Sequence, residues 1–314
     1  MIVFRSTCVI LCAWLCIGCG PAQQSQAPTA LKDSLWVAPD TALWKAEPAA
    51  KEIRYGRELI AHTAVYIGPA GTVSKKANGM NCQNCHLDAG TRPFGNNYGS
   101  VASQYPKFRA RSGTKESIEK RINDCLQRSL GGDPIDSLSR EMRAMVSYIL
   151  WVGSNVPKGQ VAAGSGLFKM DWLGRAADTV AGKKLYLQKC QTCHGRDGQG
   201  TRHPNGREYY YPPVWGTASF TTAAGLHRIS MMARYIRTNM PLGTTWRRPG
   251  LTDEEAWDIA AYLESMPRRK KVFTNDWPDI ATKPVDYPFG PFADTFDEAR
   301  HKYGPFKEMI PASR

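Results

Sequence analysis

The stretches Cys82-Gln-Asn-Cys85-His86 and Cys190-Gln-Thr-Cys193-His194 decide how this chain folds, because each is a complete Cys-x-x-Cys-His sequence. In such a sequence the two thiols form thioethers with the vinyl groups of a porphyrin, and the adjoining histidine ligates the iron from one face. A single copy would also suit a zinc knuckle or a redox dithiol. Two copies, each with a predicted helix before and after it, favour two covalently bound haem c groups. The predicted attachment residues are Cys82, Cys85, Cys190 and Cys193, and the proximal iron ligands are His86 and His194.

The composition is that of an ordinary globular protein, with 314 residues of which 42% are hydrophobic and 22% charged, and this length favours two domains. Of the nine cysteines, four lie in the first nineteen residues, four belong to the haem sequences and Cys125 stands alone, so no disulfide framework is needed. The formal charge is +13 without a basic low-complexity run. This charge favours small anions or an acidic redox partner over nucleic acid.

The first nineteen residues are typical of a secretory leader. Arg5 is followed by an apolar run over residues 8–17, which is too short to span a membrane and ends in small residues. We therefore expect export to the periplasm. The stretch Leu15-Cys-Ile-Gly-Cys19 resembles a bacterial lipoprotein signal, in which Cys19 would be lipidated. Because Cys16 stands where such signals usually have leucine, cleavage without a lipid is the alternative.

Helical periodicity and its interruptions predict an internal duplication of helix, haem sequence, loop and closing helix. Thr252 and Glu255 fit a capping box at the start of the last closing helix. The expected helices cover about 52–63, 114–130, 138–152, 182–188 and 253–263. The expected fold class is all-α, with a signal at 1–19, a spacer at 20–51, haem domains at 52–155 and 174–266, a linker at 156–173 and an extended, aromatic-rich tail at 267–314.

The second haem domain resembles a class I cytochrome c over residues 182–265, on the segments 190–195, 239–243 and 251–262. The resemblance implies that Met240, which precedes a proline, is the second axial ligand. A thioether ligand raises the reduction potential and suits a haem from which electrons leave. The competing ligands, which we expect to be packing or surface residues, are Met231, Met232, His203 and His227.

The first haem domain has no such methionine between His86 and its closing helix. The side chains there that could ligate iron are Lys107, Lys115, Lys120 and Cys125. On a helix Cys125 would lie at the border of an apolar stripe and a strip that contains Arg121, Arg128 and Ser129. Nearby arginines favour the thiolate, so we expect Cys125 as the distal ligand; the alternative is a small buried hydrophobe. His62 and Met80 are expected to pack.

Four arginines surround this predicted ligand in the sequence: Arg109, Arg111, Arg121 and Arg128. Such a group is often only a solvated surface, but planar guanidinium groups also suit oxyanions. A thiolate ligand lowers the reduction potential, so electrons would pass from the first haem to the second.

The segments 81–90, 93–97, 109–112, 121–129 and 301–306, together with the second haem domain, resemble the dihaem thiosulfate dehydrogenases. The resemblance implies an oxidoreductase that converts two thiosulfates into tetrathionate, often reversibly, and passes electrons to a c-type cytochrome or similar acceptor. It implies that Arg111, Arg121 and Ser129 bind substrate oxyanions and that Cys125 is a ligand and a participant. Some members carry a lysine next to the second-haem methionine, where this chain has Asn239, so we expect His194/Met240 ligation without that switch.

Two other functions fit part of this pattern. The chain could be a dihaem electron carrier with no substrate of its own, in which case nothing small would bind beside the first haem. It could also be the haem subunit of a sulfur-oxidation complex, which would be inactive alone. The arginine and serine strip favours the stand-alone enzyme over both.

Overall fold

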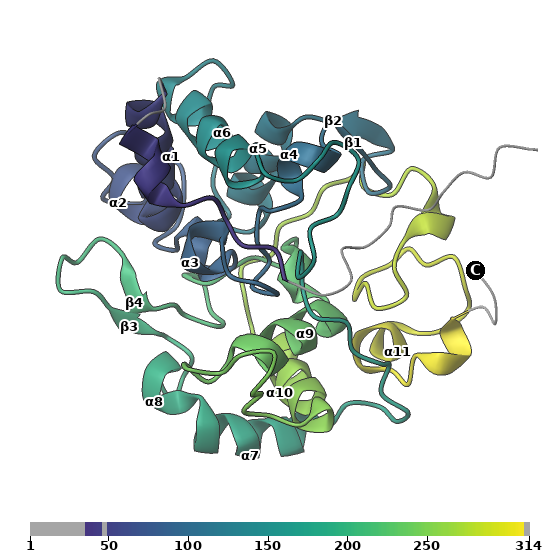
Figure 1. Ribbon diagram of the computed structural model, residues 1–314. Coiled ribbons are helices and arrows are strands. Elements are labelled where there is room, and N and C mark those ends of the chain that lie inside the picture. Colours follow the sequence, from purple (N-terminus) through teal and green to yellow (C-terminus); the bar gives the residue numbers. More distant parts are fainter. Residues whose placement is uncertain (1–34, 46–48, 311–314) are drawn as a thin grey trace, which may run out of the picture.

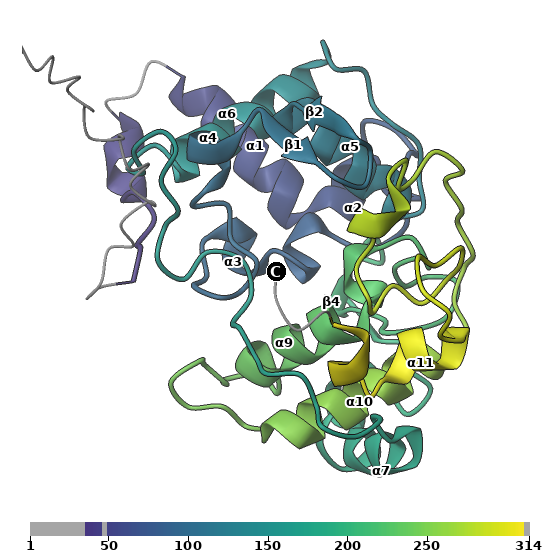
Figure 2. The same ribbon diagram turned by 90° about the vertical axis from the view of Figure 1, so that its right-hand side faces the viewer.

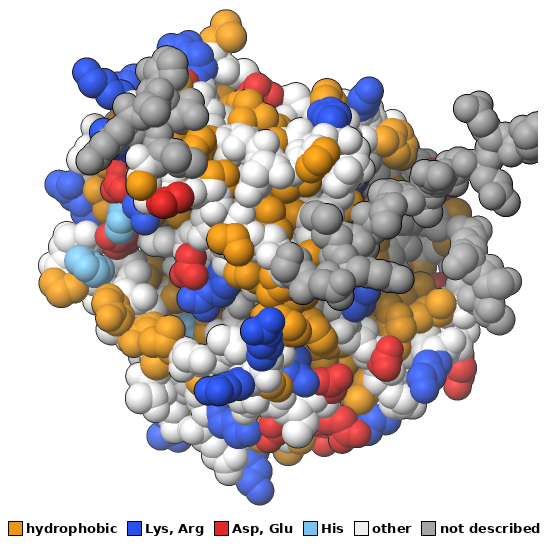
Figure 3. Space-filling view, in the orientation of Figure 1, with side chains coloured by type: hydrophobic (Ala, Val, Ile, Leu, Met, Phe, Trp, Pro, Cys, Tyr) orange, Lys and Arg blue, Asp and Glu red, His pale blue; other side chains and the backbone are white. Residues whose placement is uncertain are grey.

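The computed structural model describes residues 35–45 and 49–310, so the expected leader and most of the spacer lie outside the described residues. Two helical units lie one above the other, and the last part of the chain runs along the side of both (Figures 1 and 2). No helix among the described residues is long and apolar enough to cross a membrane. On the face shown in Figure 3 the basic side chains are spread over both units and form no single stripe.

The first unit contains the first haem sequence between two long helices. It begins with the short 3-10 helix η1 (Thr41–Lys45). Its further elements are α1 (Ala50–Ala61), α2 (Thr63–Ile67), η2 (Cys82–Asn84), α3 (Leu87–Gly90), α4 (Val101–Gln104), β1 (Lys107–Arg109), β2 (Thr114–Glu116), α5 (Ile118–Arg128) and α6 (Arg140–Val152). The helices expected near 52–63 and 138–152 are thus confirmed as α1 and α6.

The expected start of α5 at Thr114 is wrong. Residues 114–116 pair as strand β2 with β1, with Thr114 opposite Arg109. The helix is instead capped by Ser117, whose side chain accepts a hydrogen bond from the Lys120 amide. The turn between the strands needs a positive φ, which Gly113 supplies at 64°. The fold is therefore helix-rich with a little sheet, and not purely helical.

The second unit repeats the plan around the second haem sequence. Its elements are α7 (Thr179–Lys189), α8 (Gln191–His194), β3 (Thr201–Arg202), β4 (Tyr209–Tyr211), η3 (Gly225–His227), α9 (Ile229–Asn239) and α10 (Asp253–Ser265). The predicted capping box is confirmed, since the Glu255 amide donates to Thr252 Oγ1 at 3.1 Å and the Thr252 amide donates to Glu255 Oε2 at 3.0 Å. Helix α9 was expected to be loop. Its first turn is capped by a distant residue, Asp286, which accepts from the Ser230 amide at 3.2 Å.

The same helix crossing occurs in both units. At Gly56 of α1 an added Cβ would lie 1.9 Å from the Ala144 carbonyl oxygen of α6, and at Gly182 of α7 it would lie 1.9 Å from the Asp258 carbonyl oxygen of α10. In each unit a buried tyrosine, Tyr148 or Tyr262, follows four residues after that carbonyl. Glycine allows the two backbones to touch, because any side chain would separate the helices.

The tail contacts both units. It contains η4 (Ile280–Thr282), α11 (Glu298–Tyr303) and η5 (Lys307–Met309), joined by irregular segments. The carboxylate of Asp276 binds Arg128 of α5 at 2.6 Å, and that of Asp286 binds Arg228 before α9. Phe306 is buried against Trp172, with ring centroids 4.9 Å apart. The periodicity gave no sign of α11, whose cap is Asp297.

We predict that Gly56→Ala lowers the free energy of unfolding by about 1–3 kcal/mol, the usual cost of forcing an atom into a packed interior. Gly225→Ala is the matched control, because nothing lies within 4 Å of its added Cβ. Denaturant unfolding of both variants measures the effect. Equal stability of the two variants would contradict the glycine crossing.

Candidate functional site

The second haem sequence lines an apolar cavity that suits a porphyrin. Cys190, Cys193, His194 and Met240 all face it. The Nδ1 of His194 donates to the Pro212 carbonyl at 2.8 Å, which leaves Nε2 free, and burial lowers the pKa of this histidine. A neutral imidazole with a free Nε2 is the form that ligates iron.

Of the four alternative ligands of the second haem, one lines this cavity and three do not. Met232 lines the same cavity as Met240. His203 stacks on Tyr210, with ring centroids 6.4 Å apart. His227 is buried with its Nδ1 against the Glu264 carboxylate, and Met231 does not line the cavity.

The first haem sequence holds its histidine in the same way. His86 Nδ1 donates to the Asn96 carbonyl at 2.6 Å, and its ring stacks on Tyr98 with centroids 4.7 Å apart. The Cys125 thiol lies within hydrogen-bonding reach of the His86 imidazole. In both units the Cys-x-x-Cys pair and a histidine held through Nδ1, with Nε2 left as the ligating atom, therefore fit a covalently bound haem.

Cys125 has the electrostatic surroundings of a reactive thiol. Burial raises its pKa, but Arg121 in the first place, followed by His86 and Arg111, lowers it to about 7. The thiolate is therefore well populated near neutrality. Among the alternatives, Lys107 and Lys115 are exposed on the hairpin.

The third lysine that could have ligated the first haem, Lys120, is already paired with carboxylates. Lys120 Nζ lies 3.3 Å from both Glu116 and Asp124, which hold it on the outer side of α5. Of the four candidate ligands in this part of the chain, Cys125 alone is in contact with His86.

Two arginines beside Cys125 have no acceptor for their side chains among the described residues: Arg111 and Arg121. The Cys125 charge chiefly raises the pKa of Arg121, whereas burial, aided by Arg121 and Arg128, lowers the pKa of Arg111. Ser129 donates its amide to the Cys125 carbonyl at 2.9 Å, and its hydroxyl has no partner in the part of the chain that the structure describes. These groups can receive an oxyanion.

The other two arginines of the predicted group, Arg128 and Arg109, have different surroundings from those of Arg111 and Arg121. Both terminal nitrogens of Arg128 bind Asp276 at 2.6 Å, and the Phe273 ring centroid lies 3.8 Å from its guanidinium carbon, whereas its buried Nε has no hydrogen-bond partner. Arg109 is half-buried in β1, where its charge acts on Tyr105. Asp276 could not be found from the sequence, because 148 residues separate it from Arg128.

The two haem sites adjoin one another. Asn84 and Cys85 of the first haem sequence line the cavity of the second, together with Met80, which is buried as expected. Tyr235 of α9 lines the same cavity and donates its hydroxyl to the Asn84 carbonyl at 2.6 Å. The two haem-attachment sequences therefore lie next to each other.

A buried carboxylate joins the units next to the first haem sequence. Glu208 accepts hydrogen bonds from Asn81 Nδ2 at 2.8 Å, His62 Nδ1 at 3.1 Å and Asn205 Nδ2 at 3.0 Å. Although burial raises its pKa, these hydrogen bonds lower it more. His62 is therefore part of a polar interdomain contact, and the expectation that it simply packs is wrong.

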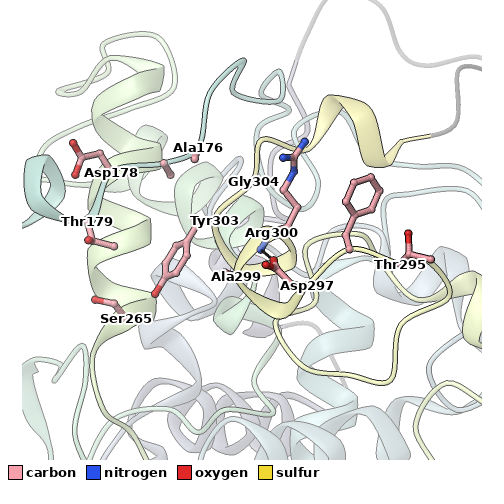
Figure 4. A pocket seen from close by; sticks show the side chains of 12 residues that line it. Ala176, Asp178, Thr179, Ser265, Thr295, Asp297, Ala299, Arg300, Tyr303 and Gly304 are labelled. Atoms are coloured by element: carbon pink, nitrogen blue, oxygen red, sulfur yellow. Dashed lines mark hydrogen bonds between the residues drawn. The ribbon is translucent and has the colours of Figure 1, made fainter.

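A wide hollow between α7, α10 and α11 has no part in these sites (Figure 4). Its lining includes Thr179, Ser265 and Arg300 but no cysteine or histidine. Arg300 is occupied by the Pro305 carbonyl, to which its Nε donates at 2.8 Å.

Comparison with known proteins supports two cytochrome c domains in tandem. Residues 72–157 match the family model of the SoxA/TsdA cytochrome c domain, and residues 179–267 match that of cytochrome c. The thiosulfate dehydrogenase of Psychrobacter arcticus is 35% identical over 242 residues, which are 77% of this chain and 71% of that protein. That of Allochromatium vinosum is 35% identical over 263 residues, which are 82% of this chain and 92% of that protein.

Among solved structures, the thiosulfate dehydrogenase TsdBA from Marichromatium purpuratum, in its as-isolated form, has a TM-score of 0.68 and 28% identity. The match covers 75% of this chain and 50% of that one, so the chain spans about half the length of that relative.

We predict that Glu208→Gln lowers the free energy of unfolding near neutrality by about 1–3 kcal/mol, because buried donors lose a charged acceptor. A depressed carboxyl pKa stabilises the fold above the ordinary value of 4.5 and loses this effect as the pH falls through the lowered pKa. The gap between wild type and variant should therefore close on acidification, as followed by denaturant unfolding at several pH values. The exposed Glu254→Gln is the control, and a gap that is independent of pH would contradict the analysis.

Proposed function

The chain belongs to the thiosulfate dehydrogenase family, and from this premise we propose that it oxidises two thiosulfate ions to tetrathionate and passes two electrons to an external acceptor. The observation that carries the proposal is the Cys125 thiol, with a pKa of about 7, beside His86 and two guanidinium groups without protein partners. An electron carrier without a substrate would not need unpaired guanidinium groups beside a reactive thiol.

Two covalently bound c-type haems belong to the two cytochrome c domains. Cys82 and Cys85 would hold the first haem through thioether bonds, and His86 and Cys125 would ligate its iron. Cys190 and Cys193 would hold the second haem, and His194 and Met240 would ligate its iron. When bound, each haem takes up and releases one electron at its iron.

The residues of the chain bind the substrate and balance its charge. Two thiosulfate dianions lose one electron each and form one sulfur–sulfur bond, which leaves a single dianion, and no proton is exchanged. Arg111 and Arg121 bind the sulfonate oxygens and offset the repulsion between the two substrates, with Ser129 as a hydroxyl donor. The thiolate of Cys125 lies where the outer sulfur of the substrate arrives.

Electrons leave through the second unit. A thiolate ligand would lower and a thioether ligand would raise a haem potential, so Cys125 would make the first unit the electron donor and Met240 would make the second unit the acceptor. Asn239 is 2% exposed and donates its amide to the Tyr235 carbonyl at 2.9 Å, which keeps it off the iron. We assign the second unit to class I, and a c-type cytochrome or similar protein as acceptor.

The proposed location rests on residues 1–19, whose sequence resembles a secretory leader. We propose export to the periplasm, where lipidation of Cys19 would attach the enzyme to a membrane. The oxidation could be reversed there with tetrathionate as the electron acceptor.

Purified, fully haemylated protein mixed with thiosulfate and ferricyanide should form tetrathionate. Cys125→Ala should abolish the reaction. Arg121→Gln should lower kcat/KM by about 100-fold or more, the usual effect of removing a charge-stabilising donor. Arg237→Gln on α9, which breaks a pair with the exposed Asp253 of α10, should stay near wild type. No tetrathionate from wild type would end the proposal.

A further inference from the structure

A segment of the tail crosses the outer side of α5. The strap, residues 273–278, holds Arg128 through Asp276, whose two carboxylate oxygens bind the two terminal guanidinium nitrogens at 2.6 Å. The side chains are only 9% and 12% exposed, and Phe273 covers the guanidinium face at 3.8 Å. Such a planar, two-point pair fixes both the charge and the direction of Arg128.

The strap also holds the hairpin that carries Arg111. The Trp277 amide donates to the Arg111 carbonyl at 2.7 Å. Pro278 lies against Gly113, where an added Cβ would be 2.6 Å from the proline Cγ. One short segment therefore positions the two elements, β1–β2 and α5, that present the oxyanion-binding side chains.

Because of the strap, the arginines near Cys125 are of two kinds: some have no carboxylate partner, and one is paired. The side chains of Arg111 and Arg121 have no hydrogen-bond acceptor among residues 35–45 and 49–310, whereas Arg128 pairs with Asp276 at 2.6 Å and has Asp124 3.8 Å from its Nε. An anion at the site therefore faces two uncompensated guanidinium groups, although three lie within range of one another.

We propose that Asp276 is a positioning residue that limits the positive charge of the oxyanion site. It withholds Arg128 from the substrate and, through the Trp277 amide, keeps Arg111 opposite α5. With two uncompensated guanidinium groups the site binds dianions but still releases the dianionic product. This role rests on the proposed thiosulfate chemistry.

The test uses sulfate, a tetrahedral dianion that cannot be oxidised, titrated calorimetrically into the oxidised holoenzyme at constant ionic strength. Asp276→Asn keeps the shape of the side chain but uncovers the charge of Arg128. The dissociation constant for sulfate should fall on the order of tenfold, as expected for one extra charge at a partly buried site. The KM for thiosulfate should fall and kcat should fall with it, because product leaves more slowly.

The double variant Arg128→Gln/Asp276→Asn removes both charges and should return the sulfate affinity to near the wild-type value. Asp258→Asn is the matched control, since it weakens another buried carboxylate that binds both terminal nitrogens of an arginine, Arg175, in the second unit. It should lower stability without changing sulfate affinity.

The proposal is overturned if Asp276→Asn binds sulfate no more tightly than wild type, if the double variant does not reverse the gain, or if sulfate does not bind wild type at all. Thiosulfate turnover by wild type in the same preparation decides the proposed function independently. If wild type turns over thiosulfate but Asp276→Asn leaves the sulfate affinity unchanged, only the role of Asp276 is refuted and the proposed function stands.

Discussion

The attraction between the Cys125 thiolate and the guanidinium groups of Arg121 and Arg111 is the interaction on which the rest of the site depends. Burial alone would keep a thiol protonated, and a protonated thiol neither ligates iron well nor attacks sulfur. The arginines reverse that preference and bring the pKa to about 7. The surrounding structure holds these charges together: Ser117 starts α5, the hairpin carries Arg111, and the strap fixes both.

The two units use one scaffold for two kinds of chemistry. Each places a haem sequence beside a helix crossing closed by a glycine, Gly56 or Gly182, and each fixes its histidine through a backbone carbonyl. Only the first unit adds a thiol with arginines, whereas the second offers a methionine in an apolar cavity. A reacting centre and an electron-transfer centre thus differ in a few side chains on the distal side.

The sequence predicted those features that depend on short spacing. The Cys-x-x-Cys-His sequences, the capping box at Thr252 and the shared helix face of Arg121 and Cys125 are local, and the structure has all of them. Features held by distant residues were missed. Helix α9 takes its cap from a residue 56 positions away, and Arg128 is paired with a carboxylate 148 positions away. No local periodicity contains such information.

The measurement that tests the account most directly is low-temperature magnetic circular dichroism of the oxidised holoenzyme, compared with Cys125→Ala. We predict a histidine/thiolate signature from the first haem, which disappears in the variant. The histidine/methionine signature of the second haem should stay unchanged. Identical spectra for the two proteins would place another ligand opposite His86 and contradict the account. A lysine signature at the second haem would contradict the assignment of Met240.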